Sequence, residues 1–233
     1  MTDTEFEDTI DWNRFWETAD EEDRESATPS THHVRGLLAD LFDEKGVPDS
    51  VADVGCGPAV VAFDVAASHP ETTVVGYDAA ESVLAENRER ARDEGLTNVA
   101  FERTLLPEFD PDLSFDLVLC FGTLTYVAET QRAVTNLYDA VAPGGHLVLG
   151  YVNQLGAAHY REMLADPEET GAEIAEPERF EERFHLALEG ESVLSYERIH
   201  EATGTWPRSF WEFTDKPEER WAWRHAPLAW IPK

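Results

Sequence analysis

Short apolar runs alternate with amphipathic stretches through the middle of the chain. The apolar runs predict buried β-strands over residues 51–54, 72–77, 98–103, 115–121 and 146–152. Between these runs, apolar residues recur at helical spacing and predict helices over residues 58–68, 81–94 and 129–141. Strands that alternate with helices in this way form a parallel sheet with helices on both faces, and right-handed crossovers fix most of its topology.

The two ends of the chain follow other patterns. Near the start, Trp12, Phe15 and Trp16 share one face of a short predicted helix, and an apolar stripe then predicts a longer helix from about residue 28 to residue 46. Residues 154–190 are acidic and mostly helical in pattern, and a further helix is predicted over 196–203. The remaining predicted elements are strands over 209–213 and 228–231 and a helical turn over 217–224.

We therefore expect an α/β fold with a doubly wound, seven-stranded, mostly parallel sheet and an N-terminal helical extension. Residues 1–48 would form the extension, which is placed to act as a lid. Residues 49–233 would form the main domain, with a helical insertion at about 154–190.

The composition adds a strong negative charge to this picture. The 233 residues include 48 Asp and Glu against 18 Lys and Arg, which gives a formal net charge of −30. Nucleic acids and anionic membranes bind clustered basic residues, so neither is expected as a partner. Because concentrated salt screens the repulsion between so many like charges, we interpret the acidity as adaptation to a very salty cytosol.

Cysteine and histidine usage excludes further kinds of site. The chain has only Cys56 and Cys120, so it has no disulfide framework or four-cysteine zinc site, and its eight His show no convincing metal-binding spacing. No apolar run reaches the roughly 20 residues of a membrane helix, and the acidic N-terminus lacks a signal-peptide pattern. We expect a cytoplasmic protein without a metal site, and the sequence leaves its oligomeric state open.

The most informative segment joins the first predicted strand to the next helix, where Asp53 precedes the turn Gly55–Gly57. Such a turn lets a nucleotide approach the backbone closely. A dinucleotide would require a glycine where Val60 stands, while Pro58 removes an N–H donor and Asp53 would repel phosphate. A cationic ligand without phosphate fits better, and S-adenosylmethionine is such a ligand.

These residues resemble the first motif of the class I S-adenosylmethionine-dependent methyltransferases, an acidic residue followed by Gly-x-Gly-x-Gly, with Ala59 in place of the third glycine. Residues 74–78 resemble the second motif, and residues 137–149 resemble the family's helix, turn and fifth strand. The resemblance covers residues 34–152 well and, with the charge, indicates a salt-adapted enzyme of haloarchaeal type. It implies a methyltransferase domain over 49–233 that moves a methyl group to a nucleophilic atom of a small-molecule acceptor.

The resemblance also implies which residues contact the cofactor. Asp78 would hold the ribose hydroxyls, and the loop around Asp53 would lie along the methionyl part. The full set of expected cofactor contacts is Asp53, Gly55, Cys56, Gly57, Asp78, Ala79, Leu105, Leu106 and Phe121. The family usually carries an acidic residue near adenine, where this chain has Leu105. That departure keeps open a second function, a cofactor-binding protein without methyl transfer. A third possibility, a nicotinamide-dependent dehydrogenase, is disfavoured by Pro58 and Val60.

The acceptor is expected beyond the carboxyl ends of the fourth and fifth strands. Phe121, Tyr126, Tyr151 and Asn153 would line its pocket. Tyr126 and Tyr151 are the candidates for a catalytic role, and ordinary packing is the alternative for both. Trp12 and Trp16, together with residues 154–190, are available to cover the pocket.

The net charge leads to a test of salt dependence. The melting temperature should rise between dilute buffer and multimolar potassium chloride, since the Debye length falls to about 3 Å at 1 M salt. Thermal unfolding followed by circular dichroism measures this dependence. A melting temperature that stays constant or falls with added salt would contradict the interpretation.

Overall fold

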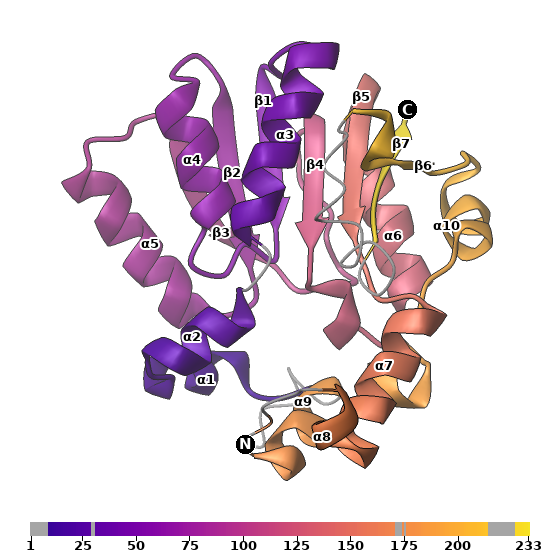
Figure 1. Ribbon diagram of the computed structural model, residues 1–233. Coiled ribbons are helices and arrows are strands. Elements are labelled where there is room, and N and C mark those ends of the chain that lie inside the picture. The colour runs from indigo at the N-terminus through magenta and orange to yellow at the C-terminus, as the bar shows by residue number, and fades with distance from the viewer. Residues whose placement is uncertain (1–8, 29–30, 171–173, 175, 214–226) are drawn as a thin grey trace.

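A mixed sheet lies at the centre of the computed structural model, which describes residues 9–28, 31–170, 174, 176–213 and 227–233. Its strands are β1 (Ser50–Val54), β2 (Thr73–Asp78), β3 (Val99–Arg103), β4 (Phe115–Phe121), β5 (Val141–Gly150), β6 (Arg208–Ser209) and β7 (Leu228–Pro232). They form a seven-stranded sheet in the order β3-β2-β1-β4-β5-β7-β6 (Figure 1). β1 to β5 pair in parallel, whereas β7 is antiparallel to both of its neighbours. The predicted α/β class and the seven-stranded, mostly parallel sheet are confirmed.

Helices pack on both faces of this sheet. On one face, α3 (Thr31–Lys45), α4 (Val60–Ser68) and α5 (Glu81–Asp93) share a core cluster with the strands. On the other face, α6 (Thr130–Asp139) and α10 (Tyr196–Thr203) share a second cluster. Successive strand residues such as Leu117 and Val118 alternate between the two clusters, because side chains of a strand point to opposite faces in turn.

The predicted strand over 209–213 is wrong. Only Arg208 and Ser209 pair with β7, and the chain then enters the 3₁₀ turn η3 (Phe210–Glu212). Phe210 and Phe213 lie three residues apart, so the turn brings both rings to one side, with centroids 5.4 Å apart. Burying Phe210 in the first core cluster therefore favours the turn over an extended strand. The helical turn predicted for 217–224 lies outside the described residues.

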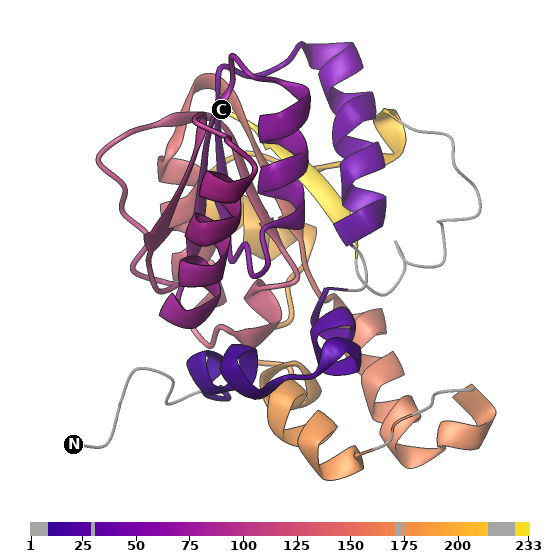
Figure 2. The ribbon, with the colours of Figure 1, turned by 90° about the vertical axis from the view of Figure 1, so that its left-hand side faces the viewer.

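Two groups of helices gather at the carboxyl ends of the parallel strands (Figures 1 and 2). The first is α1 (Trp12–Thr18) with α2 (Glu21–Ala27), and the second is α7 (Gln154–Ala165), α8 (Pro167–Thr170) and α9 (Pro177–Glu189). The sequence pattern did not predict α2, since its acidic residues carry no apolar stripe. Ligands of doubly wound sheets bind at these strand ends, where the strand order reverses, here between β1 and β4. A ligand bound there would therefore lie between the sheet and the two helix groups.

Within the part of the chain that the structure describes, no helix is both long and apolar enough to cross a lipid bilayer.

Candidate functional site

The loop after β1 uses its own N–H groups to hold its shape. The N–H groups of Gly55 and Cys56 both donate to the carbonyl of Tyr77, at 2.7 and 2.9 Å. The Gly57 N–H donates to Asp78 Oδ2 at 2.8 Å, and the Ala59 N–H donates to the Cys56 carbonyl at 2.8 Å. Pro58 has no N–H, so each N–H of residues 55–59 is already engaged. A pyrophosphate that must be held by this loop would find no free backbone donor there.

The loop reaches this shape through left-handed backbone conformations. Gly55 has φ +76° and Gly57 has φ +50°, which glycine adopts without strain. Ala59, at the position of the third glycine, also has a positive φ of 54°. An alanine in that conformation costs about 1 kcal/mol, and the complete burial of its methyl group in the first core cluster offsets this cost.

Asp78 stands at the carboxyl end of β2, where the ribose-binding residue was predicted. Its Oδ2 accepts from Gly57, and its Oδ1 accepts from the Ala80 N–H at 2.9 Å. Burial raises the pKa of Asp78, and the backbone hydrogen bonds oppose this shift. Each carboxylate oxygen has a second lone pair, and the side chain is only partly buried, so both oxygens can also accept from a ligand's hydroxyl groups.

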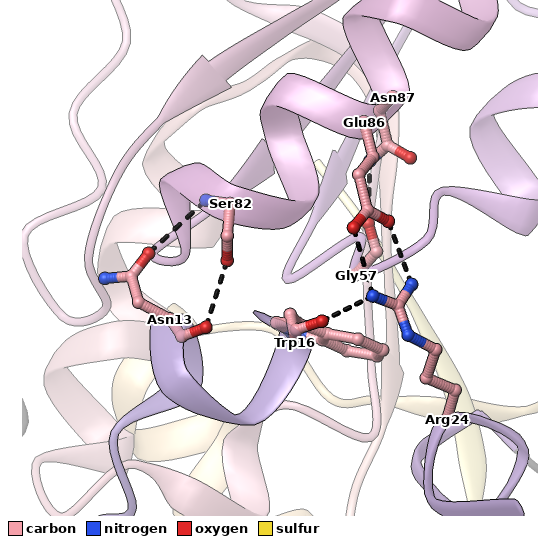
Figure 3. A network of polar contacts seen from close by, with 7 residues as sticks. All are labelled: Asn13, Trp16, Arg24, Gly57, Ser82, Glu86 and Asn87. Atoms are coloured by element: carbon pink, nitrogen blue, oxygen red, sulfur yellow. Dashed lines mark hydrogen bonds and ion pairs between the residues drawn. The ribbon is translucent and has the colours of Figure 1, made fainter. Parts of the chain in front are cut away.

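Two further side chains, Asn87 and Trp16, contact Gly57 (Figure 3). Asn87 of α5, which is buried, donates through Nδ2 to the Gly57 carbonyl at 2.7 Å. The indole of Trp16 covers the Cα of Gly57, because a Cβ added there would lie 3.2 Å from Trp16 Cζ2. Gly57 is therefore held by β2, α5 and α1 together.

Polar contacts fasten the N-terminal helices to α5 (Figure 3). The Ser82 hydroxyl donates to the Asn13 carbonyl at 3.2 Å. Arg24 of α2 donates with both Nη atoms to Glu86, at 2.8 and 3.0 Å, and also to the Trp16 carbonyl. Exposed ion pairs contribute little to stability by themselves, but a two-pronged guanidinium–carboxylate pair fixes geometry. These contacts keep Trp16 over the glycine loop.

Asp53 is buried beneath the loop, near Asp78. Burial raises the pKa of Asp53 to about 7, a hydrogen bond from the Ala62 N–H opposes the shift, and the nearby charge of Asp78 adds to it. Burial also raises the pKa of the Cys56 and Cys120 thiols, and both carboxylates add to that effect. The thiols are therefore protonated at neutral pH, which disfavours a nucleophilic role. Two carboxyl groups, Asp53 and Asp78, therefore lie next to the loop, and Asp53 is only partly ionised at neutral pH.

The segment that follows β4 packs against the glycine loop. A Cβ on Gly55 would lie 2.0 Å from Thr123 Oγ1, so only glycine allows this close approach. Phe121 packs against Gly150 in the same manner, since a Cβ on Gly150 would lie 2.0 Å from the ring. Phe121 therefore lies beside the carboxyl end of β5, and its place near the transferred group stays a prediction.

The predicted adenine side is formed by the ends of β2 and β3. The Thr104 N–H donates to the Asp78 carbonyl at 2.9 Å, and Arg103 Nε donates to the Ala79 carbonyl at 3.0 Å. Leu105 and Leu106 follow directly and are partly buried, with Leu106 packed against the second core cluster. The structure thus brings Ala79, Leu105 and Leu106 to the same sheet edge as Asp78.

The residues predicted to line the acceptor pocket do not all meet. Tyr126, in the 3₁₀ turn η2 (Leu124–Tyr126), contacts Trp12 of α1, with ring centroids 4.7 Å apart, and Phe184 of α9, at 5.6 Å. Tyr151 instead packs in the second core cluster, and Asn153 caps α7 by accepting from the Gly156 N–H at 2.9 Å. The structure thus shows packing for Tyr151 and capping for Asn153, and a role of either residue toward the acceptor stays a prediction.

Sequence reasoning missed two residues around the loop and the aromatic cluster, Asn87 and Arg183. Asn87 was detectable, because it shares the buried face of its helix with Val83 and Leu84. Arg183 lies on one helical face with Phe180 and Phe184, in a segment that otherwise reads as acidic surface. The contact of Thr123 with Gly55 depends on the loop geometry, which no local sequence pattern records.

The fold is the Rossmann-like fold that solved methyltransferases also have. The chain aligns with the plantazolicin methyltransferase BpumL, which was solved in complex with a monoazolic desmethylPZN analogue and SAH. The alignment covers 95% of this chain and 93% of BpumL, with a TM-score of 0.62 and 12% sequence identity. It also aligns with the N-methyltransferase NodS from Bradyrhizobium japonicum WM9, with a TM-score of 0.54, 15% identity, and 88% and 97% of the two chains covered. At these identities the likeness concerns the fold.

Residues 47–199 match the model of a family described as a methyltransferase domain, and the chain belongs to this family. A trans-aconitate 2-methyltransferase from Methylobacterium nodulans is 30% identical over 116 residues, which are 50% of this chain and 43% of the relative. A ubiquinone biosynthesis O-methyltransferase from Acinetobacter baumannii is 26% identical over 137 residues, 57% of each chain. The chain thus spans about half the length of these relatives.

The buried carboxyl of Asp53 leads to a prediction about pH. Because the folded-state pKa is raised from 3.8 to about 7, its contribution to stability is fully present below about pH 4 and is lost as the pH rises through 7. The side chain of Asn does not ionise, so Asp53→Asn avoids this loss. As the pH rises from 4 to 8, the unfolding free energy of the variant should therefore increase relative to that of wild type, by up to about 4 kcal/mol. Denaturant titrations at several pH values, in constant high salt, measure the difference.

Asp93→Asn provides the matched control, since it removes one carboxylate from an exposed position at the end of α5. It should leave the pH dependence unchanged. The prediction fails if Asp53→Asn and wild type lose stability in parallel over this pH range.

Proposed function

We propose that this protein transfers a methyl group from S-adenosylmethionine to a small-molecule acceptor. The observation that carries the proposal is the glycine loop, whose N–H groups are all engaged and whose neighbours Asp53 and Asp78 are carboxylic acids. Such a loop disfavours phosphate and favours a ligand with positive charge and free hydroxyl groups. Membership of the methyltransferase domain family points to the same ligand class.

The residues at the strand ends fit the parts of this ligand. Asp78 would accept from the ribose hydroxyls, Gly55–Gly57 would lie along the methionyl part, and the sulfonium supplies an activated methyl carbon. Ala79, Leu105 and Leu106 would form an apolar adenine pocket. An apolar pocket of this kind holds a ring by packing and backbone contacts, so the absence of an acid at 105 is compatible with binding. Phe121 would lie near the transferred group.

The protein's own contribution to the reaction would be placement and exclusion of water. The N-terminal extension 1–48 and the helical insertion at about 154–190 would form the two parts of a cover over the site, through α1, α2, α7 and α9. Burial raises the pKa of Tyr126, and Arg183 lowers it only in part, so the phenol keeps its proton at neutral pH. Tyr126 would therefore orient an acceptor rather than remove its proton.

Two relatives act, by their names, on trans-aconitate and in ubiquinone biosynthesis. Both names support a small organic acceptor for this chain. The charge of −30 supports a salt-adapted protein of haloarchaeal type that works in a salty cytoplasm.

The ribose contact is tested by Asp78→Ala. Loss of hydrogen bonds to a charged group should weaken binding of S-adenosylhomocysteine by about 1.5–3 kcal/mol. Isothermal titration calorimetry in molar potassium chloride measures the affinity. Asp93→Ala, which removes an exposed carboxylate from α5, should bind as wild type does. Equal affinities of Asp78→Ala and wild type would rule out the assignment.

The methyl transfer itself is tested by release of S-adenosylhomocysteine from S-adenosylmethionine in the presence of a panel of phenols, carboxylic acids and amines. Acceptor-dependent release is expected with at least one class. Tight binding of S-adenosylhomocysteine without release in any class would favour a cofactor-binding protein that performs no methyl transfer.

A further inference from the structure

One arginine of α9 lies within a cluster of aromatic rings. The Cζ of Arg183 is 5.4 Å from the ring centroid of Phe15, 5.7 Å from that of Trp12, 5.8 Å from that of Tyr126 and 5.1 Å from that of Phe184. Guanidinium groups stack favourably on such rings, and the low-polarity surroundings strengthen their interaction with other charged groups. The cluster joins α1, η2 and α9.

Two phenol groups accompany this guanidinium. Arg183 makes a hydrogen bond to the Tyr126 side chain, and its charge also acts on Tyr160 of α7. Burial raises the pKa of both tyrosines more than Arg183 lowers it. Both phenols are therefore protonated at neutral pH and can donate a hydrogen bond, as the guanidinium can.

The position of this group relative to the cofactor loop follows from a continuous series of contacts. Trp16 covers Gly57, Trp16 and Trp12 have centroids 6.5 Å apart, and Trp12 contacts Tyr126 at 4.7 Å. Tyr126 ends the turn that follows β4, and α9 packs directly on this turn. Arg183 thus lies beside the turn that follows β4, near the strand end where the acceptor is expected.

Because the molecule is strongly negative, the positive charge of Arg183 bears on which acceptor could bind beside it. With a net charge of −30 and with Asp53 and Asp78 beside the loop, the site repels anions. The outer face of α9 is acidic as well, with Glu178, Glu181 and Glu182 exposed. An anionic acceptor would therefore need a local positive group, and Arg183 supplies one.

We propose that Arg183, with the hydroxyls of Tyr126 and Tyr160, binds a carboxylate group of the methyl acceptor. A guanidinium presents two parallel N–H donors that match the two oxygens of a carboxylate, and the phenols add donors at its sides. This inference rests on the proposed function, and it restricts the acceptor to small organic acids.

The test compares acids with neutral molecules of the same shape. The full-length protein, loaded with S-adenosylhomocysteine in molar potassium chloride, is titrated with three pairs of probes: benzoate and benzamide, cinnamate and cinnamamide, succinate and succinamide. At least one acid should bind about tenfold or more tightly than its amide. If S-adenosylhomocysteine binds and no acid is preferred, the carboxylate proposal is wrong while the proposed function stands. If S-adenosylhomocysteine does not bind, the proposed function itself fails.

Variants assign the preference to Arg183. Arg183→Gln should weaken the preferred acid about 10- to 100-fold and leave the amide and S-adenosylhomocysteine nearly unchanged. Arg183→Lys, which keeps the charge but loses the planar fork, should show an intermediate loss. The matched control is Arg179→Gln, one turn earlier on α9, where the half-exposed side chain pairs with Asp23 at 3.1 Å. It removes the same charge and should keep the acid preference.

A purely structural role for Arg183 would give a different result. In that case Arg183→Gln would weaken acid and amide equally, and the proposal would be overturned. Should Arg183→Gln fail to fold, Tyr160→Phe provides the second test, because it removes one donor and retains the ring. Tyr160→Phe should weaken the acid severalfold and leave the amide unchanged, and equal affinities of wild type and variant for the acid would contradict the proposal.

Discussion

The backbone of Gly57 is held from three directions, and the arrangement of the site depends on this restraint. Its N–H is bound by Asp78, its carbonyl by Asn87, and its Cα is covered by Trp16. These partners come from β2, α5 and α1, so one residue connects the sheet, a flanking helix and the N-terminal extension. A side chain at this position would displace Trp16, and its positive φ would add strain. The loop is therefore shaped before any ligand arrives, which lowers the entropy cost of binding.

The same restraint determines which ligands the loop can hold. The N–H groups of the loop already donate to the Tyr77 carbonyl and the Asp78 carboxylate. The loop therefore offers a ligand its shape and negative charge, and it offers an anion no hydrogen-bond donors. The carboxyl of Asp53 is kept in the interior at a cost that a cationic ligand would offset, because a nearby positive charge stabilises the ionised form. Arg183 adds one positive charge within the aromatic cluster that joins α1, η2 and α9. These two groups of residues are the basis for proposing a cationic cofactor and an anionic acceptor.

Much of the fold was predictable, because the strands and helices follow local periodicity. The loop and Asp78 were predictable for a related reason, since their spacing along one β-strand, helix and β-strand unit fixes where they meet. Contacts between distant segments were not predictable. The docking of α1 and α2 on α5 depends on Ser82 and Glu86 meeting Asn13 and Arg24, more than 60 positions away, which no local pattern records. The strand expected over 209–213 failed because burial of Phe210 outweighed a β-like composition. Tyr151, although it follows β5 as expected, turns into the core instead of toward Tyr126.

A crystal structure of the complex with S-adenosylhomocysteine tests the central claim, that a preformed loop binds this ligand, most directly. The account predicts ribose hydroxyls on Asp78 and the homocysteine part along residues 55–57, with the bonds from Gly57 to Asp78 and Asn87 retained. Trp16 should remain over the loop. A complex in which the ligand lies elsewhere, or in which those two bonds are broken and the loop is rebuilt around the ligand, would contradict the account.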